Sequence, residues 1–305
     1  MVAAAGPLTI LFSAVLPIFM LIGLGAAMDR GVGLDLRTLA KLNFYLFAPA
    51  LLFVKLIETT ATGAEAAQVA LFALLHAAAM FALAWALMRG TEHEPNREVL
   101  SMGAAFYNCG NFGIPLVILA FGEQWVALLA LVIMVQNSGT YMVGAFLFEG
   151  GGRRAWARSL RGMVRLPILW AVALGGLCRW AGVEPPGLAM KPLGFLAGAL
   201  VPAALLTLGA QLARNPWPRT WRGVGLVAVL RLGVSPLVAA LVATLVGASG
   251  TLWVLLVTVA ALPMAVNIFI VAAEYEHDAE LASQAITWTT LASAATVAVV
   301  LWLAG

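Results

Sequence analysis

Charge is the scarcest feature of this chain. Only 10% of its 305 residues are Asp, Glu, Lys or Arg, whereas 63% are hydrophobic, and the mean hydropathy is +0.98. A soluble domain carries about 25% charged residues and roughly half apolar ones. The composition therefore excludes an ordinary soluble protein. It predicts an all-α polytopic membrane protein, since helices satisfy their own backbone groups in lipid.

Cysteines and catalytic motifs are also scarce. The two cysteines, Cys109 and Cys178, form no Cys-x-x-Cys pair, so no disulfide framework, metal site or cofactor is expected. The chain contains no His-Glu-x-x-His and no Gly-x-Ser-x-Gly sequence, so an intramembrane enzyme is not expected either. Although the isoelectric point is about 9.1, the basic residues are scattered through short connections, which predicts no nucleic-acid partner.

Ten apolar segments are long enough to cross a bilayer, at about 20 residues for each helical span. They cover residues 8–28, 38–57, 67–88, 98–121, 124–148, 165–183, 189–213, 222–247, 250–273 and 279–304. The sequence thus predicts ten transmembrane helices joined by short connections, with the bilayer as their solvent.

The basic residues fall mainly on one side of this predicted topology. Of the 17, only Lys55, Arg179 and Lys191 lie on one face, and Arg231 lies within the eighth segment. The other thirteen lie on the opposite face: Arg30, Arg37, Lys41, Arg89, Arg97, Arg153, Arg154, Arg158, Arg161, Arg165, Arg214, Arg219 and Arg222. By the positive-inside rule that face is cytoplasmic, so both termini are expected outside the plasma (inner) membrane.

The two halves of the chain repeat each other weakly. Leu16-Pro17-Ile18 recurs as Leu166-Pro167-Ile168, and Lys41 recurs as Lys191, both at a spacing of 150 residues. Five helices in each half require the second copy to insert upside down. We therefore expect an inverted five-helix repeat over residues 1–148, a cytoplasmic loop over 149–164, and the second repeat over 165–305.

Two of the apolar segments carry residues that interrupt a helix. The first is Asn108-Cys109-Gly110-Asn111-Phe112-Gly113-Ile114-Pro115-Leu116, in the fourth predicted helix. The second is Leu262-Pro263-Met264-Ala265-Val266-Asn267, in the ninth. Proline removes a helical hydrogen bond and glycine weakens the turn. Paired broken helices in two inverted repeats indicate a secondary transporter with its substrate site near the bilayer midplane.

These motifs resemble the auxin efflux carrier family, which includes the plant PIN auxin exporters and bacterial permeases for organic acids. The resemblance rests on Asn108 placed seven residues before Pro115, on Ala261-Leu262-Pro263 followed by Ala273-Glu274-Tyr275, and on Asn43 with Pro49-Ala50-Leu51. It covers nearly the whole chain. The short connection 149–164 and Asn267 differ from the plant exporters and are more typical of a bacterial organic-acid permease.

The resemblance implies a particular architecture. Helices 1, 2, 6 and 7 would form a scaffold domain, and helices 3–5 and 8–10 a transport domain in which the broken helices 4 and 9 cross. Pro115 and Pro263 match the prolines at the crossing, and Asn108 matches the family's substrate-binding asparagine. A homodimer through the scaffold domain is implied as well.

The chemistry of the crossing favours a small mono- or dicarboxylate, because broken helices present unpaired N–H groups at their N-termini. We expect Asn108, Asn111 and Asn267 to frame it, with backbone near Gly113 and Met264. The resemblance adds Asn43 to this set. The alternative interpretation is that some of these amides only cap the broken backbone.

Other polar residues in the apolar segments are secondary candidates for binding or coupling. They are Gln136, Asn137, Gln284, His76, Glu65 and Arg231. Hydrogen bonding between helices or contact with the membrane interface explains most of them equally well. Arg231 is a functional candidate, because a charge within a membrane segment is costly; it could instead cap a neighbouring helix. Two alternative functions stay open: a sodium-coupled anion symporter of related architecture and a passive channel.

Overall fold

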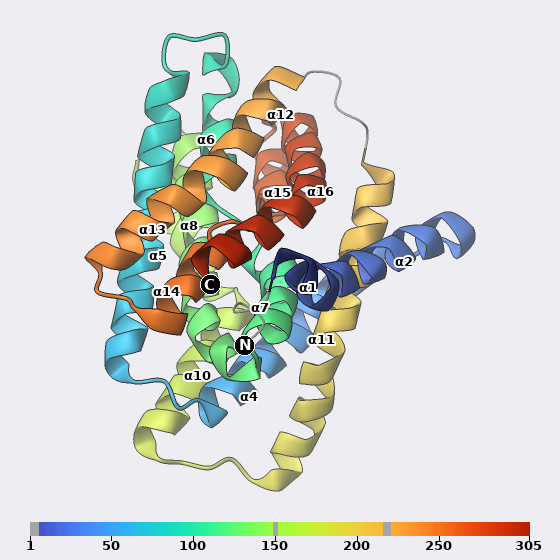
Figure 1. Ribbon diagram of the computed structural model, residues 1–305, viewed down its shortest axis with the longest axis vertical. Helices are drawn as coiled ribbons and strands as arrows, with labels where there is room; N and C mark the ends of the chain where they lie inside the picture. The colour runs from blue at the N-terminus through green and yellow to red at the C-terminus, as the bar shows by residue number, and fades with distance from the viewer. Residues whose placement is uncertain (1–5, 149–151, 216–220) are drawn as a thin grey trace.

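The computed structural model describes residues 6–148, 152–215 and 221–305, which are helical apart from connections and one isolated β-bridge. The first half contains α1 (Pro7–Ile10), α2 (Leu16–Val32), α3 (Leu36–Leu42), α4 (Ala48–Glu58), α5 (Gly63–Met88), α6 (Arg97–Ala105), α7 (Ile114–Ala120) and α8 (Val126–Phe148). The second contains α9 (Arg153–Val164), α10 (Pro167–Ala181), α11 (Gly187–Arg214), α12 (Trp221–Ala228), α13 (Ser235–Leu245), α14 (Gly250–Val259), α15 (Asn267–Glu274) and α16 (Ala279–Ala304) (Figure 1). The predicted all-α class is confirmed for the described residues.

Within the described residues, seven helices are long and apolar enough to cross a membrane: Leu11–Val32, Leu36–Glu58, Gly63–Met88, Glu123–Phe148, Gly187–Arg214, Trp221–Leu245 and Ala279–Ala304. The other three predicted spans coincide with shorter apolar helices, Cys109–Ala120, Pro167–Ala181 and Gly250–Val259. The first and last of these belong to the two interrupted segments. A ten-span topology therefore stays a prediction.

In the part of the chain that the structure describes, four π-helical turns interrupt the long helices, and each one ends two residues before a proline. They are η2 (Leu11–Val15), η3 (Asn43–Phe47), η5 (Cys109–Gly113) and η7 (Val229–Val234), ahead of Pro17, Pro49, Pro115 and Pro236. Proline has no N–H, and its ring clashes with the carbonyl four residues earlier. A π turn bonds five residues back and so accommodates the missing bond. The apolar segments continue as helices through these prolines.

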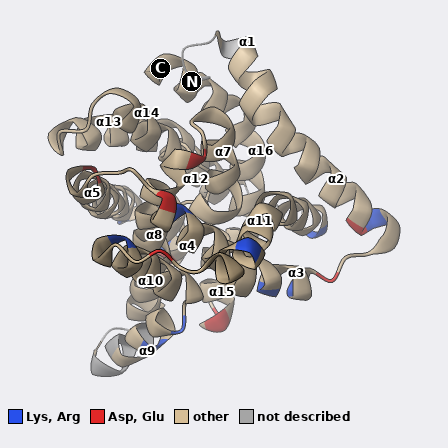
Figure 2. Cartoon of the chain, turned by 90° about the horizontal axis from the view of Figure 1, so that it is seen from below, with Lys and Arg blue, Asp and Glu red and all other residues tan. Residues whose placement is uncertain are grey.

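The outer surface of the helices is apolar. Trp180, Leu188 and Phe195 are 84%, 90% and 82% exposed, on α10 and α11. Figure 2 shows how few charged residues interrupt the tan ribbon, with Lys and Arg positions near α3 and at the end of α2. Large exposed apolar side chains are costly in water, so these faces are suited to lipid. The protein is an integral membrane protein.

Helices α2 and α11 cross with their backbones in contact (Figure 1). A methyl group at Gly209 of α11 would overlap the carbonyl oxygen of Ile22, and one at Gly25 of α2 would overlap the backbone of Leu206. Small residues allow such close approach between membrane helices, where packing replaces the hydrophobic effect. The α2–α11 pair is thereby fixed in register.

The connection predicted over 149–164 is not a plain loop. Residues 149–151 lie outside the described part of the chain, but α9 begins at Arg153 and runs to Val164. Arginines are interspersed among its apolar residues, so α9 does not form a long apolar segment and was not predicted as a helix. The basic residue Arg219 also lies outside the described residues.

Candidate substrate site at a helix crossing

The first helix break lies between α6 and η5. The chain unwinds at Phe106–Asn108, and a short antiparallel bridge then pairs Tyr107 with Met264. Two hydrogen bonds join the unwound strands: Asn108 N donates to Pro263 O (2.8 Å), and Ala265 N donates to Phe106 O (3.1 Å). Backbone groups that would be orphaned in lipid are therefore paired across the crossing.

Side chains from neighbouring helices hold the remaining backbone of the first break. Gln136 of α8 accepts a hydrogen bond from Tyr107 N (3.1 Å). Asn108 caps the following helix, since its Oδ1 accepts from Asn111 N (3.1 Å). Asn108 is only 7% exposed, and its amide nitrogen has no hydrogen-bond partner among the described residues. A donor that is buried without a partner is costly unless a ligand uses it.

The second break lies between α14 and α15 and contains Pro263. Met264 N donates to Thr289 Oγ1 of α16 (3.1 Å). No side chain caps the start of α15, where Asn267 instead donates from Nδ2 to Asn137 Oδ1 of α8 (2.9 Å). Two N–H groups of the first turn of α15 bond to backbone instead: Ile268 N donates to Ala265 O (3.2 Å) and Phe269 N donates to Val266 O (3.1 Å).

A cavity of about 530 Å³ opens onto both breaks. The asparagines that line it are Asn43, Asn108, Asn111, Asn137 and Asn267. Five amides from four segments of the chain thus face one space, together with Gln211, Tyr107 and Tyr141. The side-chain oxygens of Asn43, Gln211 and Tyr107 have no hydrogen-bond partner among the described residues.

The exposed end of this cavity is basic. Arg37 and Lys41 of α3 line it and are exposed, and none of its described lining residues is Asp or Glu. Asp35 caps α3 just before them: Thr38 donates from its hydroxyl (2.5 Å) and its amide, which lowers the pKa of Asp35. That carboxylate is engaged with its own helix. The mouth is therefore suited to attract anions.

The structure brings some predicted residues together and not others. Gly113 and Met264 do not line the cavity; Met264 is fully buried in the bridge, and Gly113 packs against Leu262. Pro263 lies between α14 and α15, and its carbonyl accepts from Asn108 N. Pro115, in contrast, stands inside the helix Cys109–Ala120, after the break. The π turn before Pro115 explains why the helix survives there.

Of the six secondary candidates, Asn137 lines the cavity and the other five do not. Glu65 forms a capping box with Thr62 at the start of α5, and Gln284 donates to Glu280 (3.1 Å). His76 is fully buried and lies 3.1 Å from Ser235 Oγ. Gln136 supports Tyr107, as described above. Arg231 is fully buried beside the crossing and bonds to both broken helices.

Sequence reasoning missed several cavity residues. Arg37 and Lys41 were assigned to the basic face of the predicted topology, and that pattern gave no sign that they line the mouth of the cavity. Tyr107 directly precedes Asn108, and that adjacency was the available signal. Tyr141 follows Asn137 by one helical turn and so shares its face of α8.

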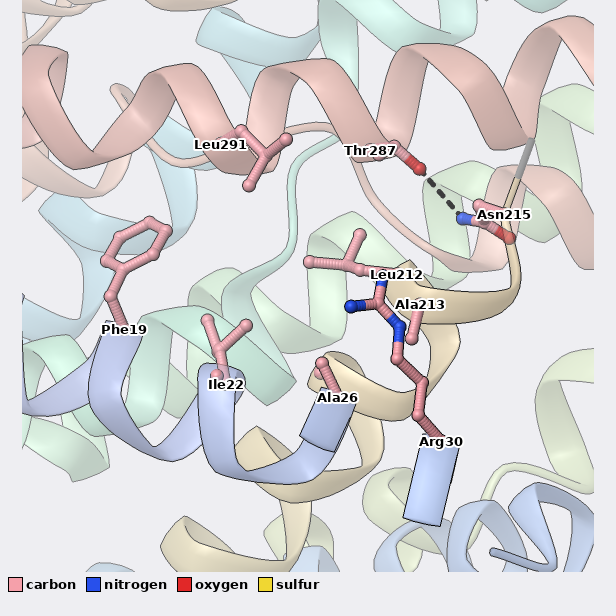
Figure 3. A pocket seen from close by; sticks show the side chains of 11 residues that line it. Phe19, Ile22, Ala26, Arg30, Leu212, Ala213, Asn215, Thr287 and Leu291 are labelled. Atoms are coloured by element: carbon pink, nitrogen blue, oxygen red, sulfur yellow. Dashed lines mark hydrogen bonds between the residues drawn. The ribbon is translucent and has the colours of Figure 1, made fainter. Parts of the chain in front are cut away.

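A second cavity, of about 480 Å³, lies between α2, the end of α11 and α16 (Figure 3). Apolar side chains form most of its wall, including Phe19, Ile22 and Leu291. Asn215 donates to Thr287 Oγ1 (2.8 Å) across it, as the dashed line in Figure 3 marks. None of the predicted substrate residues lines this space, so it is separate from the candidate site.

Comparison with known proteins assigns the chain to a family. The family model described as "Membrane transport protein" matches residues 10–301. The "Putative malonate transporter" of Rhizobium meliloti (strain 1021) is 31% identical over 95% of this chain and 94% of its own. An "Uncharacterized transporter" of Methanothermobacter thermautotrophicus is 28% identical over 85% of this chain and 86% of its own. The chain belongs to this membrane transport family, the auxin efflux carrier family, and is a membrane transporter.

Proposed function

We propose that the protein is a secondary transporter that carries a small carboxylate, with a dicarboxylate such as malonate as the first candidate. One observation carries the proposal: the cavity has basic residues at its mouth, no described carboxylate in its wall, and the unpartnered amide of Asn108 at its buried end. Such a space favours an anion and repels a cation. The relative named as a malonate transporter makes malonate the natural first ligand.

The position of an anion follows from the helix ends. A carboxylate beside Asn108 would accept from its Nδ2 and would face the uncapped first turn of α15. Helix N-termini carry partial positive charge, which stabilises an anion without adding a formal charge at membrane depth. The oxygens of Asn43 and Gln211 are acceptors, suited to a hydroxyl or a protonated carboxyl group.

We propose alternating access by two inverted repeats, with a transport domain that moves against a scaffold. Paired features support this arrangement. Gly25 and Gly175 are 150 residues apart, the same spacing as the two Leu-Pro-Ile motifs. Gly175 packs against Phe53 of α4, and Gly25 packs against α11. Gln136 and Thr289 likewise each support one helix break. Inverted repeats around broken helices are the usual basis of such carriers.

The cavity mouth and the opposite end suggest which way the site faces. The mouth lies at Arg37 and Lys41, on the side predicted to be cytoplasmic. On the other side Lys55 of α4 lies 2.6 Å from Glu123, which begins η6 (Glu123–Trp125). We infer an inward-facing state in which the Lys55–Glu123 pair joins the proposed scaffold to the proposed transport domain and must break for outward opening.

Transport of malonate into proteoliposomes tests the proposal. We expect saturable uptake of labelled malonate that is faster when unlabelled malonate is preloaded inside, and loss of this counterflow in Asn108→Asp. Uptake that rises linearly with concentration and is insensitive to preloading would indicate a channel. Failure of mono- and dicarboxylates alike to bind or cross would refute the anion site.

A further inference from the structure

The side chain of Arg231 joins the two broken helices at the crossing. Its Nη1 donates to Ala104 O (2.8 Å) and Ala105 O (3.2 Å), the last carbonyls of α6. Its Nη2 donates to Ala260 O, at the end of α14, and to Ser235 Oγ. One guanidinium therefore bonds to the C-terminal ends of both half-helices.

These carbonyls need a partner. The last carbonyls of a helix receive no hydrogen bond from an N–H group of the same helix, and the helix C-terminus carries about half a negative charge. Two such ends meet here inside an apolar protein, where water does not replace the missing donors. A cation with several donors in one plane satisfies both ends at once, which a neutral side chain does not.

The charge of Arg231 is balanced by dipoles. Its described partners are three carbonyl oxygens, one hydroxyl and the ring of Tyr107, whose centre lies 4.6 Å from Cζ. None of these partners is a carboxylate. Carbonyl and hydroxyl oxygens are the ligands that small hard cations prefer in proteins. The guanidinium is therefore surrounded by the same types of oxygen ligand that would bind a monovalent metal cation.

Hydrogen bonds to Ala260 and His76 hold Ser235, whose Oγ faces Arg231. Ser235 Oγ donates to Ala260 O (2.8 Å), so it accepts from Arg231. His76 Nε2 lies 3.3 Å from Ser235 O, a carbonyl that only accepts, and the bond therefore assigns the proton to Nε2. His76 is a donor in a network that orients Ser235, and this gives the buried histidine a structural role.

We propose that Arg231 is a built-in cation that holds the two helix breaks in position, and that it replaces a bound metal ion such as sodium at the crossing. The substrate cavity would then keep its shape without a coupling ion at this place. Arg231 is a positioning residue, because its partners are protein carbonyls and not the substrate. The sodium dependence of transport rests on the proposed function. The role of the Arg231 guanidinium at the helix breaks does not rest on it.

Chemical rescue in detergent tests the proposal without any substrate. Arg231→Ala opens a guanidinium-sized space, and we expect its thermal transition to fall by about 5 °C or more. Guanidinium at roughly 10–20 mM, far below the concentrations that denature proteins, should restore part of this loss saturably. Sodium chloride and potassium chloride at equal ionic strength are tested in the same way, to measure whether a small cation also restores stability. Arg222→Ala is the matched control, since Arg222 is on the same helix but its side chain is 78% exposed.

Each outcome bears on the proposal. Saturable rescue of Arg231→Ala by guanidinium or a small cation, absent from wild type and Arg222→Ala, supports it. Equal responses in all three proteins would overturn it, as would an Arg231→Met variant as stable as wild type. If Arg231→Ala does not fold, Arg231→Lys keeps the cation and should fold with a lower transition, whereas Arg231→Gln should not.

Transport supplies the second readout. Wild-type malonate uptake should be unchanged when sodium is replaced by choline, and a requirement for sodium would overturn the claim that Arg231 replaces the ion. If no carboxylate is transported but guanidinium still rescues Arg231→Ala, the proposed substrate fails and the role of Arg231 stands.

Discussion

The backbone groups exposed at the two helix breaks are paired by different residues. At the first break, Asn108 caps the next helix and leaves its amide nitrogen free beside the cavity. At the second, Pro263 interrupts the helix, α15 begins without a side-chain cap, and Asn267 is engaged by Asn137. The first break thus offers an unpartnered side-chain donor and the second offers a helix N-terminus without a side-chain cap, so substitutions at the two breaks should have unequal effects.

The largest effect is expected at Asn108. Asn108→Asp keeps an oxygen that caps Asn111 N but replaces the free donor with a negative charge. A hydrogen bond to a charged group contributes about 1.5–3 kcal/mol, so malonate affinity should fall by roughly 10- to 100-fold or more. Isothermal titration of the purified variant measures this. Unchanged affinity would remove Asn108 from the site.

Removing the support of each break compares them directly. Thr289→Val leaves Met264 N unpaired and should lower stability by about 1–3 kcal/mol. Gln136→Met leaves Tyr107 N unpaired but also removes the partnerless Nε2 of Gln136, so its cost should be smaller. Thermal unfolding measures both. Thr290→Val is the control, since Thr290 bonds only to its own helix (2.7 Å), and a loss there equal to that of Thr289→Val would contradict the assignment.

A smaller effect is expected at the start of α15. Asn267→Ala and Asn137→Ala each break one bond of 2.9 Å between part-buried amides. Each should weaken malonate binding by about 3- to 10-fold, the equivalent of roughly 0.5–1.5 kcal/mol. Because the two side chains act as a pair, the double variant should be little worse than either single one. Additive losses would show that each amide contacts substrate separately.

The smallest effect is expected at the cavity mouth. Arg37→Gln or Lys41→Gln removes an exposed charge that attracts anions, and should raise the KM for malonate by no more than about threefold. The difference should disappear near 1 M salt, where the Debye length is about 3 Å. Initial uptake rates at two ionic strengths measure it. A loss that persists at high salt would mean direct contact with bound substrate.

Much of the site follows from amides in apolar segments. Asn43, Asn108, Asn111, Asn137 and Asn267 were predicted from sequence and resemblance, and one cavity brings them together. An amide in lipid needs a partner, so its presence in an apolar run is informative. Their roles at the site remain predictions until binding is measured.

Other features depend on contacts that local sequence does not encode. Pro115 has the sequence signature of a helix break, yet the π turn before it keeps the helix intact, and the chain unwinds nearer Tyr107. The partners of Arg231 are carbonyls from α6 and α14, which any residue type supplies. Backbone acceptors leave no mark in the sequence, so only the three-dimensional arrangement reveals them.

The π turns also set the facing of side chains. A π turn holds one residue more between bonded groups than an α turn does, and each residue in an α-helix advances about 100°. Deleting one residue within Asn43–Phe47 should leave an apolar helix of nearly the same length. That helix could still cross a membrane, but its N-terminal part, with Lys41, would rotate about 100° away from the cavity. Each extra residue therefore acts as a spacer that sets which side chains of two helical segments share a face.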